Sequence, residues 1–261
     1  MSKKAILVAS FGTSYNETRK KTIEAIEKQV AETFPDYEVR RAFTSRMIIR
    51  KLKERDGNHV DYVTEAMDKL SSEGFDEVIV QPTHIVNGEE YDDIVRIVTD
   101  HVGHIKTLKM GTPLLTSSAD YDRAVEAIRK CLLPLAGERD LVLMGHGTVH
   151  YSNSAYCQLQ MKLYGAGLRN VFVTTVEGYP EFGDTIAVMN ERKCRKAVAI
   201  PFMVVAGDHA ENDMAGDEED SLCSMLKAEG YDVECVVRGL GEFPGFRQLF
   251  MDHIRYAIEK P

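Results

Sequence analysis

Short apolar runs alternate with longer amphipathic segments along the whole chain. Runs rich in Val and Ile, which predict strands, occur in the first half at residues 4–10, 37–43, 77–81 and 107–110. Similar runs occur in the second half at residues 141–144, 171–176, 197–204 and 233–237. Strands that alternate with helical segments are typical of parallel sheets with crossover helices. The pattern therefore predicts an α/β fold with one parallel sheet in each half.

Helical periodicity is clearest just after the first strand. Ser14–Glu17 has the spacing of a capping box, and apolar residues then recur on one helical face as far as Phe34. Residues 121–132 and 246–258 predict further helices. No low-complexity linker separates the halves. We therefore expect an N-terminal α/β domain at residues 1–120 and a C-terminal α/β domain at residues 121–261.

The two halves also repeat one another in sequence. The run at 4–10 leads into Phe11-Gly-Thr, and the run at 141–144 leads into Gly-His146-Gly-Thr. Further on, a matching stretch places Glu90 opposite His209. We expect two similar Rossmann-like half-domains, related by a pseudo-twofold axis around a central cleft. Such an arrangement would bring two imidazoles and a carboxylate together, as in proteins that handle metal ions.

Length, charge and cysteine content narrow the functional class. The 261 residues suffice for two domains, and no segment approaches the roughly 18 to 20 apolar residues of a membrane span. The apolar run near the N-terminus is too short for a signal peptide, so we expect a cytoplasmic protein without membrane contact. A formal net charge of −9 argues against nucleic-acid binding. The five cysteines form no Cys-x-x-Cys pair, which favours free thiols.

Ligands of open α/β sheets bind beyond the carboxyl ends of the strands. Gly12, Gly88, Gly147 and Gly207 lie in loops at these ends and suit sharp turns or a close approach to a ligand. None belongs to a dinucleotide or P-loop fingerprint, so a nucleotide cofactor is poorly supported. The candidate substrate contacts in the first half are Ser10, Phe11, Gly12, Thr13, Asn87, Gly88 and Glu89.

His146 and His209 are the strongest metal-ligand candidates, because each lies in a glycine-flanked turn at a corresponding place in the two halves. Imidazole suits cobalt, nickel, iron and zinc alike, which leaves the metal open. Glu177 follows the strand at 171–176 and would complete a His-Glu-His site, unless it caps a helix. The roles of His84 and His150 stay open.

An acidic run follows His209 and ends at Asp220. Its acids suit the first turn of a solvated helix, where negative charge meets the positive end of the helix dipole. The alternative is a holding place for a hydrated divalent cation.

Seven motifs occur in order along the chain: Val8–Tyr15, Arg41–Ser45, Met47–Leu52, His84–Tyr91, Met144–Gly147, Val176–Pro180 and Val205–Ala215. Together they resemble the anaerobic sirohydrochlorin cobaltochelatases of the CbiK family, over essentially the whole chain. The resemblance implies a class II chelatase that inserts Co²⁺ into sirohydrochlorin early in anaerobic cobalamin synthesis. It implies no ATP and no cofactor beyond the substrate metal.

The resemblance also implies roles for single residues. His146 would be the catalytic base and a metal ligand, His209 and Glu177 would be the other ligands, and Glu90 would be a catalytic carboxylate. The family's Glu-Ser-Tyr-Pro reads Glu177-Gly178-Tyr-Pro here, which we expect to loosen the turn.

The implied partners are sirohydrochlorin and a divalent metal ion, and a homo-oligomer is compatible with the sequence. Arg46, Arg50 and Lys51 are candidates to anchor the carboxylates of the substrate. Two alternatives stay open: insertion of Fe²⁺ or Ni²⁺ into the same tetrapyrrole, and a carrier that binds metal or tetrapyrrole without turnover.

Overall fold

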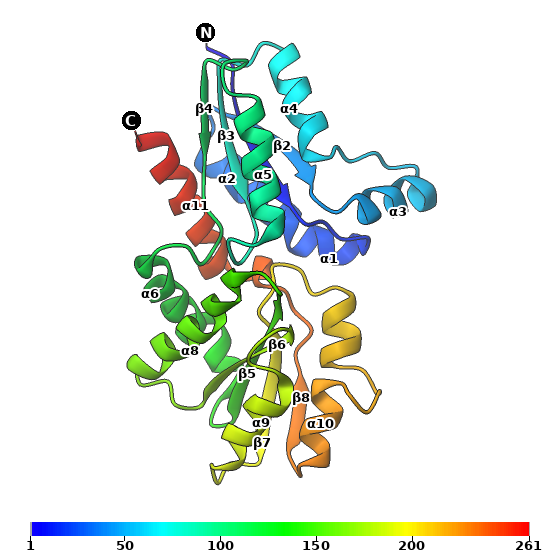
Figure 1. Cartoon of the computed structure of the whole chain (residues 1–261), viewed down its shortest axis with the longest axis vertical. Helices are drawn as coiled ribbons and strands as arrows, with labels where there is room; N and C mark the ends of the chain where they lie inside the picture. The colour runs from blue at the N-terminus through cyan, green and yellow to red at the C-terminus, as the bar shows by residue number, and fades with distance from the viewer. Residues whose placement is uncertain (1, 261) are drawn as a thin grey trace. The chain divides into compact units, whose positions relative to one another are not determined.

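The chain forms two compact units in the computed structural model, which describes residues 2–260 (Figure 1). Unit 1 comprises Met1–Thr116 and Arg247–Pro261, and unit 2 comprises Ser117–Phe246. The division near residue 117 lies close to the predicted boundary. The placement of the two units around a shared cleft stays a prediction.

The C-terminal helix, α11 (Pro244–Glu259), differs from the prediction, because from Arg247 onward it belongs to unit 1 and not to the C-terminal domain. Lys109 Nζ donates to the Ile258 carbonyl at 2.9 Å, and His253 Nδ1 lies 3.0 Å from the Thr112 carbonyl. Apolar periodicity identified the helix, but it carries no information about which sheet the helix covers.

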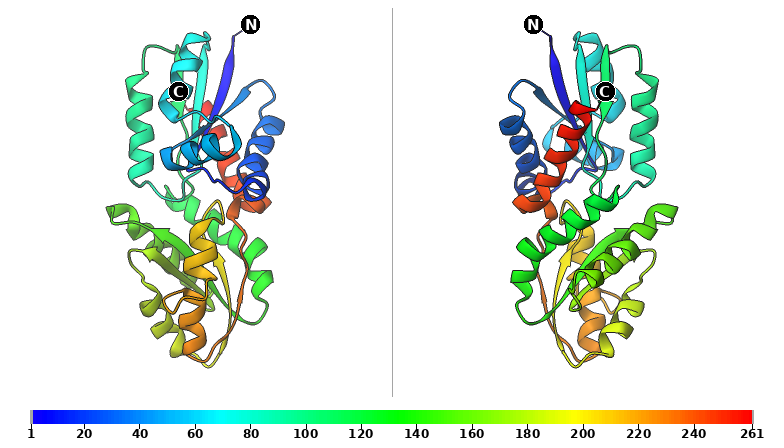
Figure 2. Two further views of the ribbon diagram at one scale, coloured as in Figure 1. Left: turned by 90° about the vertical axis from the view of Figure 1, so that its right-hand side faces the viewer. Right: turned by 90° about the vertical axis from the view of Figure 1, so that its left-hand side faces the viewer.

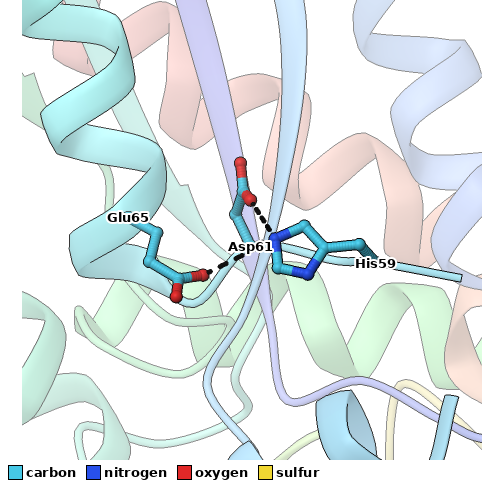
Figure 3. A group of neighbouring side chains, drawn as sticks. All are labelled: His59, Asp61 and Glu65. Atoms are coloured by element: carbon cyan, nitrogen blue, oxygen red, sulfur yellow. Dashed lines mark hydrogen bonds and ion pairs between the residues drawn. The ribbon is translucent and has the colours of Figure 1, made fainter. Parts of the chain in front are cut away.

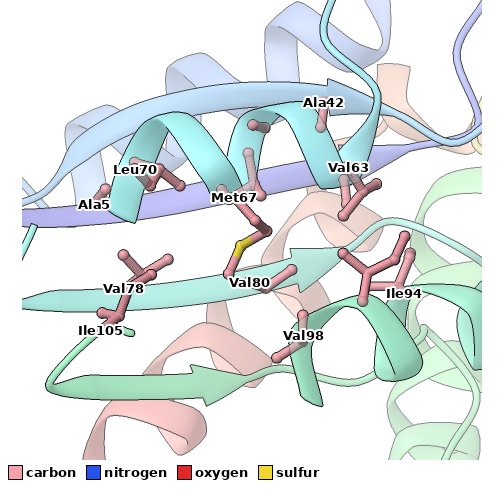
Figure 4. Packing of buried hydrophobic residues seen from close by; sticks show 14 of the residues in the cluster. Ala5, Ala42, Val63, Met67, Leu70, Val78, Val80, Ile94, Val98 and Ile105 are labelled. Atoms are coloured by element: carbon pink, nitrogen blue, oxygen red, sulfur yellow. The ribbon is translucent and has the colours of Figure 1, made fainter. Parts of the chain in front are cut away.

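Unit 1 contains a parallel sheet in the order β2-β1-β3-β4. Its strands are β1 (Lys4–Ser10), β2 (Glu38–Phe43), β3 (Glu77–Pro82) and β4 (Thr107–Met110). The connecting helices are α1 (Asn16–Lys21), α2 (Ile23–Thr33), α3 (Arg46–Asp56), α4 (Val63–Ser72) and α5 (Glu89–Asp100). Figure 4 shows α4 and α5 over one face of this sheet, where Met67, Ile94 and Val80 belong to one buried cluster.

Unit 2 contains a second parallel sheet, in the order β6-β5-β7-β8. Its strands are β5 (Asp140–Gly147), β6 (Val171–Glu177), β7 (Lys196–Pro201) and β8 (Asp232–Cys235). The α-helices are α6 (Ser118–Ala127), α7 (Leu133–Ala136), α8 (Ser154–Gly165), α9 (Phe182–Asn190) and α10 (Leu222–Ala228). The π-helical turns are η1 (Ile128–Leu132) and η3 (Ala210–Met214), and the 3-10 turns are η2 (Tyr151–Asn153) and η4 (Leu240–Glu242). Within each unit, helices lie on both faces of the sheet (Figure 2).

The predicted repeat agrees with the strand register. Ala9 of β1 pairs with Pro82, the last residue of β3. In the same way, Met144 of β5 pairs with Pro201, the last residue of β7. Phe11 and His146 each follow two residues after that pairing. The two residues therefore occupy equivalent positions at the carboxyl ends of β1 and β5.

Matching positions extend into the loops after β3 and β7. The Leu114 N–H donates to the His84 carbonyl at 2.9 Å, and the Leu240 N–H donates to the Met203 carbonyl at 2.8 Å. His84 therefore corresponds to Met203, as the sequence repeat predicts. Farther along, Glu90 lies in the first turn of α5, and its counterpart His209 immediately precedes η3.

Some predicted boundaries were wrong. The capping box at Ser14 does not form, because α1 is capped by Tyr15 without a side-chain hydrogen bond, and Ser14 itself is buried. β7 ends at Pro201 instead of residue 204. The Phe202 N–H still donates to the Met144 carbonyl of β5, but the Met203 and Val204 carbonyls accept from the Leu240 and Gly241 N–H groups, which lie outside the strands. The helix predicted at 121–132 divides into α6 and the π-helical turn η1.

Two compositional predictions can be compared with the structure. All five cysteines are free thiols. Between residues 2 and 260, no helix is both long and apolar enough to cross a membrane.

Candidate metal and active site

The turn that carries His146 requires both of its glycines. A side chain at Gly145 would place its Cβ 2.2 Å from the ring of Tyr156, which is buried beneath the end of β5. Gly147 has a φ of +80°, and a Cβ there would lie 1.9 Å from the Glu177 carbonyl oxygen. Only glycine fits these two positions. The motif therefore presses the end of β5 against α8 and β6, which fixes the backbone of His146.

His146 and His209 lie side by side in unit 2, as the sequence predicts. Their Nε2 atoms are 3.1 Å apart, and their rings are nearly perpendicular, with centroids 4.5 Å apart. His146 comes from the carboxyl end of β5 and His209 from the loop after the adjacent β7. Both side chains are partly exposed, so a small ion can reach them.

The partners of the other ring nitrogens assign the tautomers of both histidines. His146 Nδ1 lies 2.9 Å from the Gly147 carbonyl, and His209 Nδ1 lies 2.7 Å from Asp213 Oδ2. A carbonyl and a carboxylate accept hydrogen bonds, so each Nδ1 carries the hydrogen. The two Nε2 lone pairs then face one another and repel unless a cation lies between them.

The spacing of the two Nε2 atoms suits one metal ion. For metal–nitrogen bonds of about 2.1 Å, their 3.1 Å separation corresponds to an angle of about 95° at the metal, that of neighbouring ligands in six-coordinate geometry. This arrangement can bind a divalent first-row metal, and an imidazole that is not ligating can accept a proton.

Glu177 lies at the carboxyl end of β6, in register with Gly147. Its side chain is exposed, and among the described residues its carboxylate has no hydrogen bond or ion pair. The backbone of Glu177 is therefore beside the histidine turn. Its role as a metal ligand stays a prediction.

Gly178 does not loosen the turn after Glu177. Its φ is +128°, and a Cβ would lie 2.6 Å from Asn153 Oδ1. Asn153 ties the turn to the histidine loop, because its Nδ2 donates to the Tyr179 carbonyl at 2.7 Å while its Oδ1 accepts from the Thr148 N–H at 3.1 Å. Glycine fits a backbone conformation that a serine would adopt only with strain.

The loop after β1 presents one exposed side chain among its four predicted contacts. Ser10, Gly12 and Thr13 are buried, whereas Phe11 is 46% exposed. Gly12 has a φ of +101°, and a Cβ there would lie 2.6 Å from the Phe43 ring. Phe11 is therefore the residue of this loop that offers a surface to a flat ligand.

The loop after β3 contains the other predicted contacts. Asn87 Nδ2 donates to the Leu115 carbonyl at 3.3 Å, so its amide already holds a neighbouring loop. Gly88 caps α5 with an ordinary φ of −95°, and Gly207 also lacks a positive φ. Neither position therefore needs glycine for its backbone conformation, and the predicted close approach of these glycines to a ligand stays a prediction. Glu89 and Glu90 are exposed in the first turn of α5, where the helix dipole favours negative charge.

The structure distinguishes the two histidines whose roles were open. His150 Nδ1 accepts from the Ser152 N–H at 3.2 Å and so caps η2. His84 is half-buried: its Nδ1 is buried without a partner, and its Nε2 lies 3.4 Å from Thr44 Oγ1. Burial lowers the pKa of His84 to about 4, against the opposing effect of the Glu90 charge.

Two neighbours of the histidine pair, Asp213 and Tyr156, were not predicted from the sequence. Asp213 was counted among the acids of a solvated turn, although its spacing of four residues from His209 could have indicated a contact on one helical face. Tyr156 gave no signal, because an apolar residue in a helix predicts core. Its burial raises its pKa to about 12, so its hydroxyl stays protonated.

A second cluster with metal-ligand side chains lies in unit 1, just before α4 and in its first turn (Figure 3). His59 Nε2 lies 2.9 Å from Asp61 Oδ1 and 3.9 Å from Glu65 Oε2. Lys69 Nζ lies 2.6 Å from the same Asp61 oxygen, and the Tyr62 N–H donates to Glu65 Oε2. Because an ammonium ion and a backbone N–H already occupy these carboxylates, the cluster is a network of ion pairs.

An open depression of about 440 Å³ lies beside this cluster and is lined in part by Arg41 and Lys69. Both cations are paired with carboxylates, Arg41 with Glu27 and Lys69 with Asp61. The depression therefore offers little free charge to a ligand, and the chemistry of the chain lies at the histidine pair.

The cationic side chains near the start of α3 are exposed. The Arg46 guanidinium stacks over the Tyr62 ring at 3.8 Å, and Lys51 Nζ lies 5.9 Å from the centre of the Tyr15 ring. Arg50 is also exposed. Their predicted role in holding substrate carboxylates stays a prediction.

Comparison with known proteins gives the same family over the whole chain. A family model described as cobalt chelatase (CbiK) matches residues 4–259. A sirohydrochlorin cobaltochelatase of Salmonella typhimurium is 41% identical over 256 residues, which cover 98% of this chain and 97% of that protein. The sirohydrochlorin cobaltochelatase CbiKC of Nitratidesulfovibrio vulgaris is 32% identical over 262 residues, with coverages of 99% and 92%.

Solved structures show the same fold at much lower identity. SirB from Bacillus subtilis with Fe³⁺ has a TM-score of 0.67 and 13% identity, covering 98% of this chain and 96% of that one. CbiX, described as the terminal enzyme of siroheme biosynthesis in denitrifying bacteria, has a TM-score of 0.58 and 15% identity, with coverages of 98% and 99%. The two-sheet α/β fold is thus a chelatase fold, and the match of the family model from residue 4 to residue 259 shows that this chain belongs to the CbiK family of cobalt chelatases.

Proposed function

We propose that this protein inserts Co²⁺ into sirohydrochlorin, as the names of its curated relatives describe for those enzymes. The observation that carries the proposal is the pair of Nε2 atoms 3.1 Å apart on His146 and His209, in a chain that matches the family throughout. This pair suits a reaction in which a divalent ion must be held and then released.

Metal insertion makes two chemical demands on the protein. The macrocycle loses two pyrrole N–H protons, and the metal exchanges water for ring nitrogens, so the site needs bases together with metal ligands. A ligating imidazole that gives up the metal regains a lone pair for a proton. We assign His146 as base and ligand, and His209 as the second ligand.

Carboxylates complete the proposed chemistry. Glu177, beside the histidine turn, is exposed and free to ligate the arriving ion. Glu90 is exposed at the start of α5 and would accept a proton from the macrocycle. Phe11 offers an aromatic face to the ring system. The reaction needs no cofactor beyond the substrate metal. A cytoplasmic location and a homo-oligomeric state stay predictions.

Turnover distinguishes this enzyme from a carrier. Sirohydrochlorin and Co²⁺ are mixed under anaerobic conditions with protein at about one hundredth of the substrate concentration, and the absorbance spectrum is followed. An enzyme converts all of the tetrapyrrole, well above the uncatalysed rate, whereas a carrier changes the spectrum only in proportion to its own amount. Parallel reactions with Fe²⁺ and Ni²⁺ measure the metal preference, and a higher rate with either ion would replace cobalt in the proposal.

A further inference from the structure

We propose that Asp213 is a positioning residue for the metal site: it holds the Nδ1–H of His209 and thereby turns the Nε2 lone pair of that ring toward the metal. The inference rests on the proposed function for its metal, but its geometry stands on the contacts in unit 2 alone.

The first support is the hydrogen bond between the two side chains. His209 Nδ1 lies 2.7 Å from Asp213 Oδ2, a separation typical of a charge-assisted bond. Nε2 of the same ring faces His146. If Nδ1 lost its hydrogen to Nε2, an N–H would point into the space that a metal has to occupy. The carboxylate excludes that tautomer, because an acceptor cannot face the Nδ1 lone pair.

The second support is that the contact has little value for the stability of the fold. The side chains of His209 and Asp213 are 39% and 41% exposed. Exposed ion pairs at this helical spacing contribute little to stability, and many contribute nothing measurable. A bond of this geometry therefore affects ring orientation far more than it affects folding.

The third support is the backbone between the two residues. Residues Ala210–Met214 form the π-helical turn η3, a geometry that is frequent at functional sites. The turn is followed by Gly216, whose N–H donates to the Asn212 carbonyl at 3.0 Å. Glycine is needed there, because a Cβ would lie 2.3 Å from the same carbonyl oxygen. The turn thus holds Asp213 in a defined position, with its Oδ2 2.7 Å from His209 Nδ1.

The test compares three variants of the full-length protein. Asp213→Asn keeps the shape but offers an N–H that can face Nδ1 and favour the wrong tautomer. Asp213→Glu keeps a carboxylate, on a side chain that is longer by one methylene group. Glu211→Gln removes a charge from an exposed position of the same turn and serves as the matched control.

Three readouts are needed. Long-range ¹⁵N–¹H NMR of metal-free protein reports the tautomer of His209, titration with Co²⁺ alone reports affinity, and initial rates separate kcat from KM. We expect the Nδ1–H form in the wild type, and Co²⁺ affinity about 10- to 100-fold weaker in Asp213→Asn. The Asp213→Asn variant should also lose kcat, with KM for sirohydrochlorin and the melting temperature nearly unchanged. Asp213→Glu should recover most of the affinity, and Glu211→Gln should match the wild type.

The proposal is overturned if the metal-free wild type carries the hydrogen of His209 on Nε2. It is equally overturned if Asp213→Asn binds Co²⁺ as the wild type does, or no more weakly than Glu211→Gln. If Asp213→Asn does not fold, the proposal is still tested by the tautomer of His209 in the wild type and by the Co²⁺ affinity of Asp213→Glu. A protein that binds Co²⁺ in this way but never inserts it would refute the proposed function and leave the role of Asp213 intact.

Discussion

His146 and His209 each use one ring nitrogen to hold the ring in place and keep the other for a ligand. Replacing either residue with Ala should lower the insertion rate by at least about 100-fold, because a base and a metal ligand are lost together. His104→Ala is a suitable control, since His104 is exposed in unit 1. Circular dichroism should show an intact fold in all three variants. A normal rate in folded His146→Ala protein would refute its assignment as the base.

His84 should make the protein sensitive to acid. In the folded state its pKa is lowered to about 4, whereas an exposed histidine titrates near 6.5. Between these values the unfolded chain binds a proton that the folded chain does not, so stability falls as the pH falls from 6.5 toward 4. From pH 7 to pH 5 the free energy of unfolding should drop by about 2 kcal/mol from this residue.

Urea unfolding of His84→Met measures that contribution, because Met is the residue at the equivalent position in unit 2. The variant should lose about 2 kcal/mol less than the wild type between pH 7 and pH 5. His104→Gln should behave as the wild type does. Equal pH dependence in His84→Met and wild type would show that His84 is solvated.

Single residues differed in how far the sequence could predict them. The histidine pair was predictable because a repeat marked its two members at matching strand ends. Asp213 was not, because an acid in an acidic run looks the same whether it faces water or an imidazole. The bond from the Asn87 amide to the Leu115 carbonyl could not be predicted either, because the two residues meet only once the chain folds, and the contact of Asn87 with substrate stays a prediction.

At the scale of elements, the turn that ends β5 depends on its backbone conformation. Gly147→Ala should destabilise the protein by roughly 2 to 4 kcal/mol, because it adds left-handed strain to a clash with the Glu177 carbonyl. Gly165→Ala is the matched control, since Gly165 lies in α8 and a Cβ added there would have no neighbour within 4 Å. That substitution should raise stability by up to about 1 kcal/mol.

Thermal unfolding of the two variants checks this account of the turn. Opposite shifts in melting temperature are expected, downward for Gly147→Ala and level or upward for Gly165→Ala. Similar shifts in both would mean that the turn tolerates a side chain and that His146 is less firmly fixed than its backbone contacts imply.

Strand cores were predictable because buried parallel strands are apolar throughout, whereas their ends were less so. β7 stops at Pro201, and the Met203 and Val204 carbonyls bond to the backbone of residues 240 and 241, a contact between residues distant in the sequence. The π-helical turns η1 and η3 could not be predicted either, since apolar periodicity does not distinguish a wider turn from an ordinary helical one.

At the scale of the whole molecule, unit 1 is discontinuous in sequence, because its last segment follows unit 2 along the chain. From Arg247 onward the C-terminal helix belongs to unit 1, and the buried apolar side chains of this part are Leu249, Phe250, Met251, Ile254 and Ala257. Burying the four larger ones stabilises by roughly 1.5 to 3 kcal/mol each, which together is comparable to the net stability of a domain.

A fragment of residues 1–116 should therefore lack cooperative unfolding, whereas the same fragment joined by a flexible linker to residues 244–260 should regain it. Residues 117–246 should fold alone, because unit 2 is continuous in sequence. Urea titration followed by circular dichroism measures both expectations. Cooperative unfolding of residues 1–116 without the helix would contradict the division of the chain into these units.

The central claim is that one cobalt ion binds between His146 and His209. The most direct measurement is anomalous diffraction at the cobalt edge from crystals soaked in Co²⁺ without tetrapyrrole. We predict one dominant peak at about 2.0 to 2.3 Å from both Nε2 atoms, with water or Glu177 at the remaining positions. A dominant peak at His59, Asp61 and Glu65, with none between the paired imidazoles, would contradict the account.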